Sequence, residues 1–238
     1  MAGNGGEQGD DLAFLKEAVE SLKMPGLAAP MLLSVILLPA TNILLLFNLP
    51  TRAEPDHGPY LAAFAAALVV HAALAIAILR ILNGSPRPAW SPDWSAWAYG
   101  LVILAEFAIG LFSDAIMSRS PGIMAVIASE IVSTAIIVPL APWFVAIAVD
   151  RPLAWNPAPW FRRARIWLPA LLLWNFLILA PAGVAYRLVL ETSLAEIDRR
   201  DWPWFILHGV VTAALMFLAL ALASVAYRRI ARDRPYGR

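Results

Sequence analysis

Long apolar runs separated by short polar connections dominate this chain of 238 residues. Each of six runs is long enough to cross about 30 Å of hydrocarbon as a helix that rises about 1.5 Å per residue. Apolar runs of this length are typical of membrane-spanning helices. The pattern predicts an all-α, polytopic membrane protein with six transmembrane helices, at 27–47, 60–82, 97–117, 122–149, 166–190 and 204–227.

A shorter helix is predicted ahead of the first run. Asp10 and Asp11 favour a helix start, and Pro25 with Gly26 ends the segment. We expect residues 1–26 to form a disordered tail and an amphipathic helix at the membrane surface, 27–227 the transmembrane domain, and 228–238 a basic cytoplasmic tail. The Gly-rich, acidic start does not fit a cleavable signal peptide. The apolar stripe of this helix comprises Leu12, Leu15, Val19 and Leu22.

Prolines inside three of the runs predict irregular helices, because proline lacks the amide donor of a regular helix. Pro139 and Pro142 predict a tilt or kink in the fourth run. Pro39 lies in the first run and Pro181 in the fifth.

Charge distribution sets the expected orientation. With the N-terminus inside, the inner segments carry thirteen Lys and Arg residues and the outer loops carry five. An excess of positive residues marks the cytoplasmic side, so both termini should be cytoplasmic. Two lysines against sixteen arginines, with abundant Ala, Pro and Trp, favour a GC-rich bacterial genome and therefore a multi-pass protein of the bacterial inner membrane.

Four polar side chains fall near the middle of the predicted membrane. Glu106 and Glu130 each lie deep inside an apolar run, where a carboxyl group is costly and often marks function. At 1.5 Å per residue, His71 and Asn175 fall at a similar depth, so the four are expected to meet in one layer that faces protein. The sets expected to share a face are Ala63, Ala67 and His71; Glu106, Gly110 and Ser113; and Glu130, Ser133, Thr134 and Ile137.

These residues allow two interpretations. Either a glutamate alternates between charged and neutral as a proton or cation passes, or both glutamates stay protonated and hydrogen-bond neighbouring helices. His57 and His208 lie towards the outer side, away from His71, so haem or zinc ligation is not expected. The absence of cysteine excludes disulfides and thiolate metal sites, and no catalytic or nucleotide-binding motif is present. We therefore expect no metal, no cofactor and no nucleic-acid partner.

Three segments resemble a known family: residues 137–144 (IVPLAPWF), the basic aromatic connection 160–167 (WFRRARIW) and the closing residues 224–229 (SVAYRR). They are similar to bacterial six-helix membrane domains of the glycerophosphodiester phosphodiesterase membrane-domain type. The resemblance implies a poorly characterised bacterial membrane protein. It transfers no site residues, and no soluble catalytic domain is present to carry the enzymatic activity.

The leading hypothesis is a non-enzymatic accessory or scaffold component that packs with lipid and with a membrane-protein partner or a second copy of the chain. The alternative is a small proton-coupled carrier or channel that uses Glu106 and Glu130, with His71 and Asn175 as neighbours. An intramembrane enzyme is the least favoured, because no nucleophile–base arrangement is visible.

Overall fold

The computed structural model describes residues 7–48, 57–117, 123–150, 154–184 and 202–232, and these residues form helices and no strand. The α-helices are α1 (Glu7–Ser21), α2 (Ala28–Phe47), α3 (Gly58–Leu82), α4 (Trp94–Met117), α5 (Ile123–Ile137), α6 (Ala141–Val149), α7 (Ala158–Ala164), α8 (Leu168–Trp174) and α10 (Trp202–Arg232). Two 3₁₀ turns, η1 (Pro25–Leu27) and η2 (Val138–Leu140), and one π-helical turn, η3 (Asn175–Leu179), lie between them.

Four helices or helix pairs are long and apolar enough to cross a membrane. They are Pro25–Phe47, Gly58–Leu82, Met124–Val149 and Trp202–Arg232. A fifth exists if Ala158–Ala164 and Leu168–Val184, which bend by 80°, form one span. The all-α prediction is confirmed, and four or five such helices suggest a multi-pass membrane protein. The expected third span coincides with α4, whose apolar stretch Trp94–Ile109 is shorter.

The irregularities predicted from proline take two forms. At Pro139 the η2 turn separates α5 from α6 within the expected fourth span. Ahead of Pro181 the helix widens into η3, where the amide of Ala180 donates to the carbonyl of Asn175 five residues back. Because the proline ring crowds the carbonyl four residues earlier, a wider turn at this point relieves the clash. Pro39 lies inside α2 without a break in the helix.

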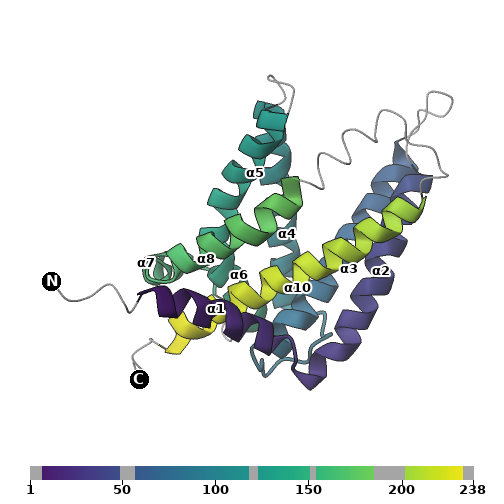
Figure 1. Cartoon of the computed structure of the whole chain (residues 1–238). Helices are drawn as coiled ribbons and strands as arrows, with labels where there is room; N and C mark the ends of the chain where they lie inside the picture. Colours follow the sequence, from purple (N-terminus) through teal and green to yellow (C-terminus); the bar gives the residue numbers. More distant parts are fainter. Residues whose placement is uncertain (1–6, 49–56, 118–122, 151–153, 185–201, 233–238) are drawn as a thin grey trace.

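The helices form two groups that α10 joins (Figure 1). α2 packs along α3 and α10 on one side, and α4 packs against α5 on the other. α10 runs diagonally across the molecule, and α1 crosses its C-terminal half. The chain segments nearest to both termini therefore lie at the same end of the molecule.

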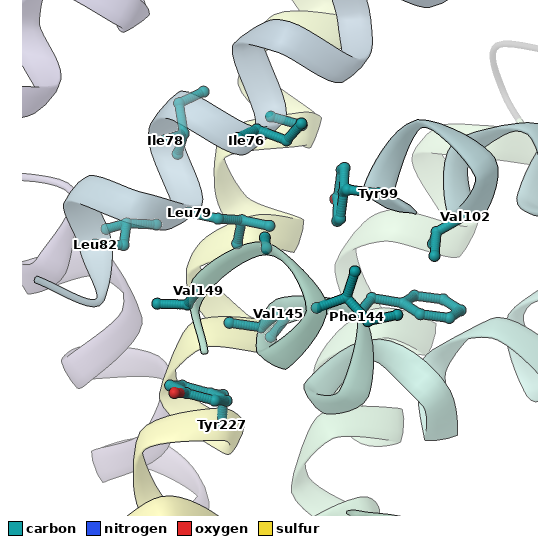
Figure 2. Packing of buried hydrophobic residues seen from close by; sticks show 14 of the residues in the cluster. Ile76, Ile78, Leu79, Leu82, Tyr99, Val102, Phe144, Val145, Val149 and Tyr227 are labelled. Carbon is teal, nitrogen blue, oxygen red and sulfur yellow. The ribbon is translucent and has the colours of Figure 1, made fainter. Parts of the chain in front are cut away.

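The core lies at the end where α1 crosses α10. Side chains are buried on every face of the helix at 74–80 in α3, 144–149 in α6 and 221–227 in α10. Figure 2 shows α6 at the centre, with Val145 and Val149 between Leu79 and Leu82 of α3 and Tyr227 of α10, and with Phe144 towards Tyr99 and Val102 of α4. α6 thus contacts helices on all sides, so the short helix after η2 holds the two groups together.

The α1 helix exists, but its buried side differs from the predicted stripe. Phe14 and Ala18 are fully buried, whereas Leu12 and Val19 are 66% and 44% exposed. The helix packs through this other side because the neighbouring Glu17 pairs with two arginines of α10, and the small Ala18 allows a close approach. Its position at the membrane surface stays a prediction.

Candidate functional site

Glu106 lies on the side of α4 that faces the protein. Tyr99, Val102 and Ile103 on the preceding turns are buried, and Glu106 continues this stripe as a half-buried side chain. A carboxyl group in this position is removed from lipid without being fully enclosed. Gly110 and Ser113, expected on the same face, belong to α4, but their burial is outside what the structure describes.

Glu130 lies where α5 meets the segment after η3. A Cβ atom added to Gly183 would fall 2.7 Å from Oε1 of Glu130, so the carboxylate rests directly on the glycine backbone. On the same helix Ser133 is buried and donates from its hydroxyl to the carbonyl of Ser129, at 2.9 Å. The inward orientation predicted for Glu130 and Ser133 agrees with this packing.

Asn175 begins the π-helical turn. Its amide nitrogen Nδ2 donates to the carbonyl of Leu171 at 2.7 Å, one turn earlier in the same helix. The carbonyl of Leu171 also accepts the backbone amide of Asn175, so the side chain adds a second bond where the irregular segment begins.

His71 lies at a different level from Glu106. The rings of Phe64 in α3 and Phe107 in α4 contact one another, with centroids 4.7 Å apart. His71 follows Phe64 by two turns along the antiparallel neighbour, about 10 Å further along the axis, which places it nearer to the level of Gly100. Ala63 is buried and His71 is half-buried, so their shared face does turn towards the protein.

The four candidates thus turn inward, but His71 and Glu106 lie at different levels along their helices. The side-chain hydrogen bond of Asn175 stays within its own helix. Glu130 contacts Gly183, and Glu106 continues the buried stripe of α4.

A second polar cluster inside the spans escaped the sequence interpretation. Where α2 crosses α10, Nδ2 of Asn42 lies 2.7 Å from Nδ1 of His208, and Oγ1 of Thr212 lies 3.0 Å from Nε2. With the Asn42 amide as donor, His208 is neutral, carries its proton on Nε2 and donates to Thr212. A Cβ atom on Gly209 would lie 2.4 Å from the backbone nitrogen of Pro39, so the two helices touch backbone to backbone. The signal available in the sequence was the adjacent His208 and Gly209 in an apolar run.

The strongest polar network lies at the end of the molecule that holds the core. Arg80 is only 1% exposed, and its guanidinium binds Oδ1 of Asp93 at 2.6 Å and the hydroxyl of Ser95 at 2.8 Å. Arg80 also donates to the carbonyls of Pro88 and Ser91, at 2.9 and 2.8 Å. This arginine holds the whole connection between α3 and α4 in place.

Arg80 at the end of α3 and two residues of the connection after it cap α6 from outside the helix. The last carbonyls of a helix lack partners within it. Arg80 donates to the carbonyl of Ala148 at 3.3 Å, and Ser85 donates to that of Val149 at 3.2 Å. Arg87 donates to the carbonyl of Asp150 at 2.8 Å, and cations at a helix C-terminus also complement its dipole.

Asp93 accepts hydrogen bonds from the side chains of Arg80, Arg87 and Ser95. Burial alone would raise its pKa, but the hydrogen bonds from Arg87 and Ser95 and the charge of Arg80 outweigh burial and hold the pKa of this carboxyl well below its usual range. Asp93 also accepts the backbone amides of Ser95 and Ala96, at 3.1 and 3.2 Å, and so caps the start of α4. An aspartate just ahead of an apolar run was the available sequence signal for this cap.

Two further contacts attach α10 to this end. The hydroxyl of Tyr227 donates to the carboxylate of Asp150. Arg228 and Arg229 pair with Glu17 of α1, at 3.3 and 3.1 Å. These polar and charged groups therefore act as bonds that attach α10 to α1 and to the end of α6.

Within the described ranges, no group of three or more His, Asp and Glu side chains could hold a metal ion. No family model, curated protein or solved structure matches the chain, and the resemblance to the glycerophosphodiester phosphodiesterase membrane domains therefore stays a prediction.

Proposed function

We propose that this chain is a non-enzymatic, six-span protein of the bacterial inner membrane that acts as an accessory or scaffold component, packing against another membrane protein. One observation carries the proposal. At the core end, the ion pairs of Arg80 and Arg87 with Asp93 and of Arg228 and Arg229 with Glu17 hold the helices together. In contrast, α2 presents an apolar face that no helix of the described residues covers.

Helix lengths and positions support six spans. α4 has 24 residues and covers the expected third span, and its first turns belong to the core. The bent pair from α7 through Val184 begins the expected fifth span. Six crossings return the chain to its starting side, in agreement with α1 and the end of α10 lying together.

The proposed orientation has the core end in the cytoplasm. Arg80, Arg87, Arg228 and Arg229 all lie at that end, in contact with each other's helices or connections. Positive residues accumulate on the cytoplasmic side of bacterial membrane proteins.

The exposed face of α2 is the proposed contact with a partner. Its residues recur every three or four positions, as they do where membrane helices pack, and alanines among them permit close approach. The exposed positions that form this α2 face are Ala29, Leu33, Ile36, Ala40, Leu44 and Phe47.

Purification from native membranes in mild detergent tests the proposal. We expect a partner protein or a second copy of the chain at fixed stoichiometry, lost in Ala40→Leu because the larger side chain prevents close helix packing. Ala66→Leu, the same substitution at an exposed position of α3, should leave the complex intact. A monomer without a fixed partner, or a complex indifferent to Ala40→Leu, contradicts the proposal.

A proton-coupled carrier is the second candidate, favoured by the position of Glu130. Its carboxylate rests on Gly183, beside the η3 turn and Pro181, and interrupted helices form the ion sites of many transporters. Here Glu130 takes up and releases the proton, and Glu106 is the second carboxyl on the inward face of α4.

Proteoliposomes with a trapped pH dye test the carrier. Under an imposed pH gradient, Glu106→Gln and Glu130→Gln should insert normally and abolish proton flux. Gly183→Ala should reduce the flux by displacing the carboxylate of Glu130, whereas Gly100→Ala meets open space and should not. Unchanged flux in both glutamine variants removes this candidate.

A further inference from the structure

The connection around α7 forms an elbow at the core end of the molecule. α7 and the following helix bend by 80°, so α7 lies across the direction in which the next segment runs. Figure 1 shows α7 end-on, beside the start of α8 and near α1. In the proposed orientation, the elbow lies where the chain re-enters the membrane from the cytoplasm.

The inner side of the elbow is fixed to the core. Trp160 is buried and stacks on Tyr227 of α10, with ring centroids 5.3 Å apart and planes inclined by 18°. Ala164, one turn later, is also buried. Trp143 of α6 donates from Nε1 to the carbonyl of Ala154 at 2.6 Å, ahead of α7. The outer side is therefore presented on a rigid support.

The outer side combines cations with large apolar groups. Arg162, Arg163 and Arg165 are all exposed, and no carboxylate of the described residues forms a recorded ion pair with them. The sequence holds no Asp or Glu from 151 to 190. The apolar members are also well exposed: Trp155 by 58%, Phe161 by 53% and Ile166 by 67%. We call these six residues the α7 patch.

Four other arginines at this end have protein partners. Arg80 and Arg87 pair with Asp93, and Arg228 and Arg229 pair with Glu17. Within the described residues, the arginines of the α7 patch thus differ from these four in having no recorded ion-pair partner.

We propose that the α7 patch binds the headgroups of anionic phospholipids in the inner leaflet; this proposal rests on the membrane placement given above. Guanidinium groups bind phosphate oxygens in a bidentate manner, and basic clusters beside a span attract anionic lipid. Tryptophan and phenylalanine favour the headgroup region, where an apolar ring meets acyl chains. Exposed apolar side chains on both sides of the arginines favour a lipid over a soluble anion.

Native mass spectrometry of the detergent-purified full chain, titrated with phosphatidylglycerol or phosphatidylcholine, tests the assignment. We expect phosphatidylglycerol to bind at least about tenfold more tightly than phosphatidylcholine. The triple variant Arg162→Gln, Arg163→Gln, Arg165→Gln should lose this preference. The control, Lys16→Gln, Lys23→Gln, Arg232→Gln, removes three exposed charges at the same end and should retain it.

Equal binding of the two lipids by the wild type, or equal loss in both triple variants, overturns the proposal. A match between the affinities for glycerol 3-phosphate and phosphatidylglycerol also overturns it, because the apolar side chains then contribute nothing. The three single Arg→Gln variants provide a graded series in case the triple variant does not fold, and an unchanged preference in all three counts against the patch. Extraction of the wild type from membranes by alkaline carbonate would instead refute the membrane placement itself.

Discussion

Replacing Arg80 is the sharpest test of what holds the helices together. Arg80→Met keeps most of the apolar stem and removes the guanidinium. Among the described residues, the substitution leaves Asp93 with Arg87 as its remaining ion-pair partner, and it takes a donor from the end of α6 at Ala148. Because the site is buried, water cannot simply replace the missing donors.

The expected magnitude follows from the contacts. Arg80 makes five hydrogen bonds of 3.3 Å or less, one of them to a carboxylate at 2.6 Å. Removing one member of a fully buried ion pair costs about 3–5 kcal/mol. Asp93 keeps Arg87 as a partner and its side chain is 23% exposed, so the expected cost lies at the lower end of this range. We expect a loss of this order in the free energy of unfolding. Arg80→Lys keeps the charge but offers fewer donors and no planar guanidinium. Its free energy of unfolding should lie between those of the wild type and Arg80→Met.

Unfolding by sodium dodecyl sulfate in mixed micelles, followed by circular dichroism, measures this free energy. Arg232→Met, at an exposed arginine near the end of α10, is the control and should change stability by less than about 0.5 kcal/mol. If Arg80→Met costs under about 1 kcal/mol, the network does not hold this end together and the reasoning fails.

The same network predicts a pH dependence. The pKa of Asp93 is depressed in the folded state, so its contribution to stability is fully present above its unfolded pKa of about 4 and is lost as the pH falls through the lower folded value. The stability difference between the wild type and Asp93→Asn should therefore stay constant from pH 8 to pH 5 and shrink only in more acidic solution. A difference that already changes between pH 8 and pH 6 contradicts this assignment.

Three further experiments test other contacts, the first two in the same unfolding assay and the third by limited proteolysis. Gly209→Ala should cost about 1–3 kcal/mol because its methyl group meets the backbone of α2, whereas Gly100→Ala meets open space and should be neutral or slightly stabilising. A double-mutant cycle of Asn42→Ala and His208→Ala should give a coupling of about 0.6 kcal/mol, the average for hydrogen bonds between membrane helices, and zero coupling would show that the bond is not formed. Glu17→Gln should make α1 more susceptible to limited proteolysis by weakening its attachment to α10, and unchanged cleavage would show that apolar packing alone holds α1.

Apolar run length predicts the helices of this chain well because it depends only on local sequence. The runs at 27–47 and 60–82 correspond closely to α2 and α3, and Pro139 marks the η2 turn. The elbow at α7 and the stripe that α1 buries were not predicted. Both depend on partners far away in the sequence, Tyr227 in one case and Arg228 and Arg229 in the other.

The candidate site was predictable in orientation but not in assembly. Helical spacing was enough to place Glu106 and Glu130 on inward faces. Depth counted from the ends of the runs placed His71 and Glu106 at the same level. The contact between the rings of Phe64 and Phe107 gives α3 and α4 a different axial position relative to one another. That position depends on side-chain packing between the helices, which run length does not describe. The pair of Asn42 and His208 depends on the crossing of α2 and α10, which no single segment encodes.

The account rests on a chain that crosses the membrane repeatedly with its arginine-rich end inside, and cysteine labelling tests this most directly. The chain has no cysteine, so single-cysteine variants report one position each. Pro86→Cys lies in the exposed connection at the arginine-rich end, and His57→Cys is exposed at the opposite end, just before α3. In intact spheroplasts, a membrane-impermeant maleimide should label His57→Cys and should reach Pro86→Cys only after permeabilisation. Labelling of both variants in intact spheroplasts, or the reverse pattern, would contradict the account.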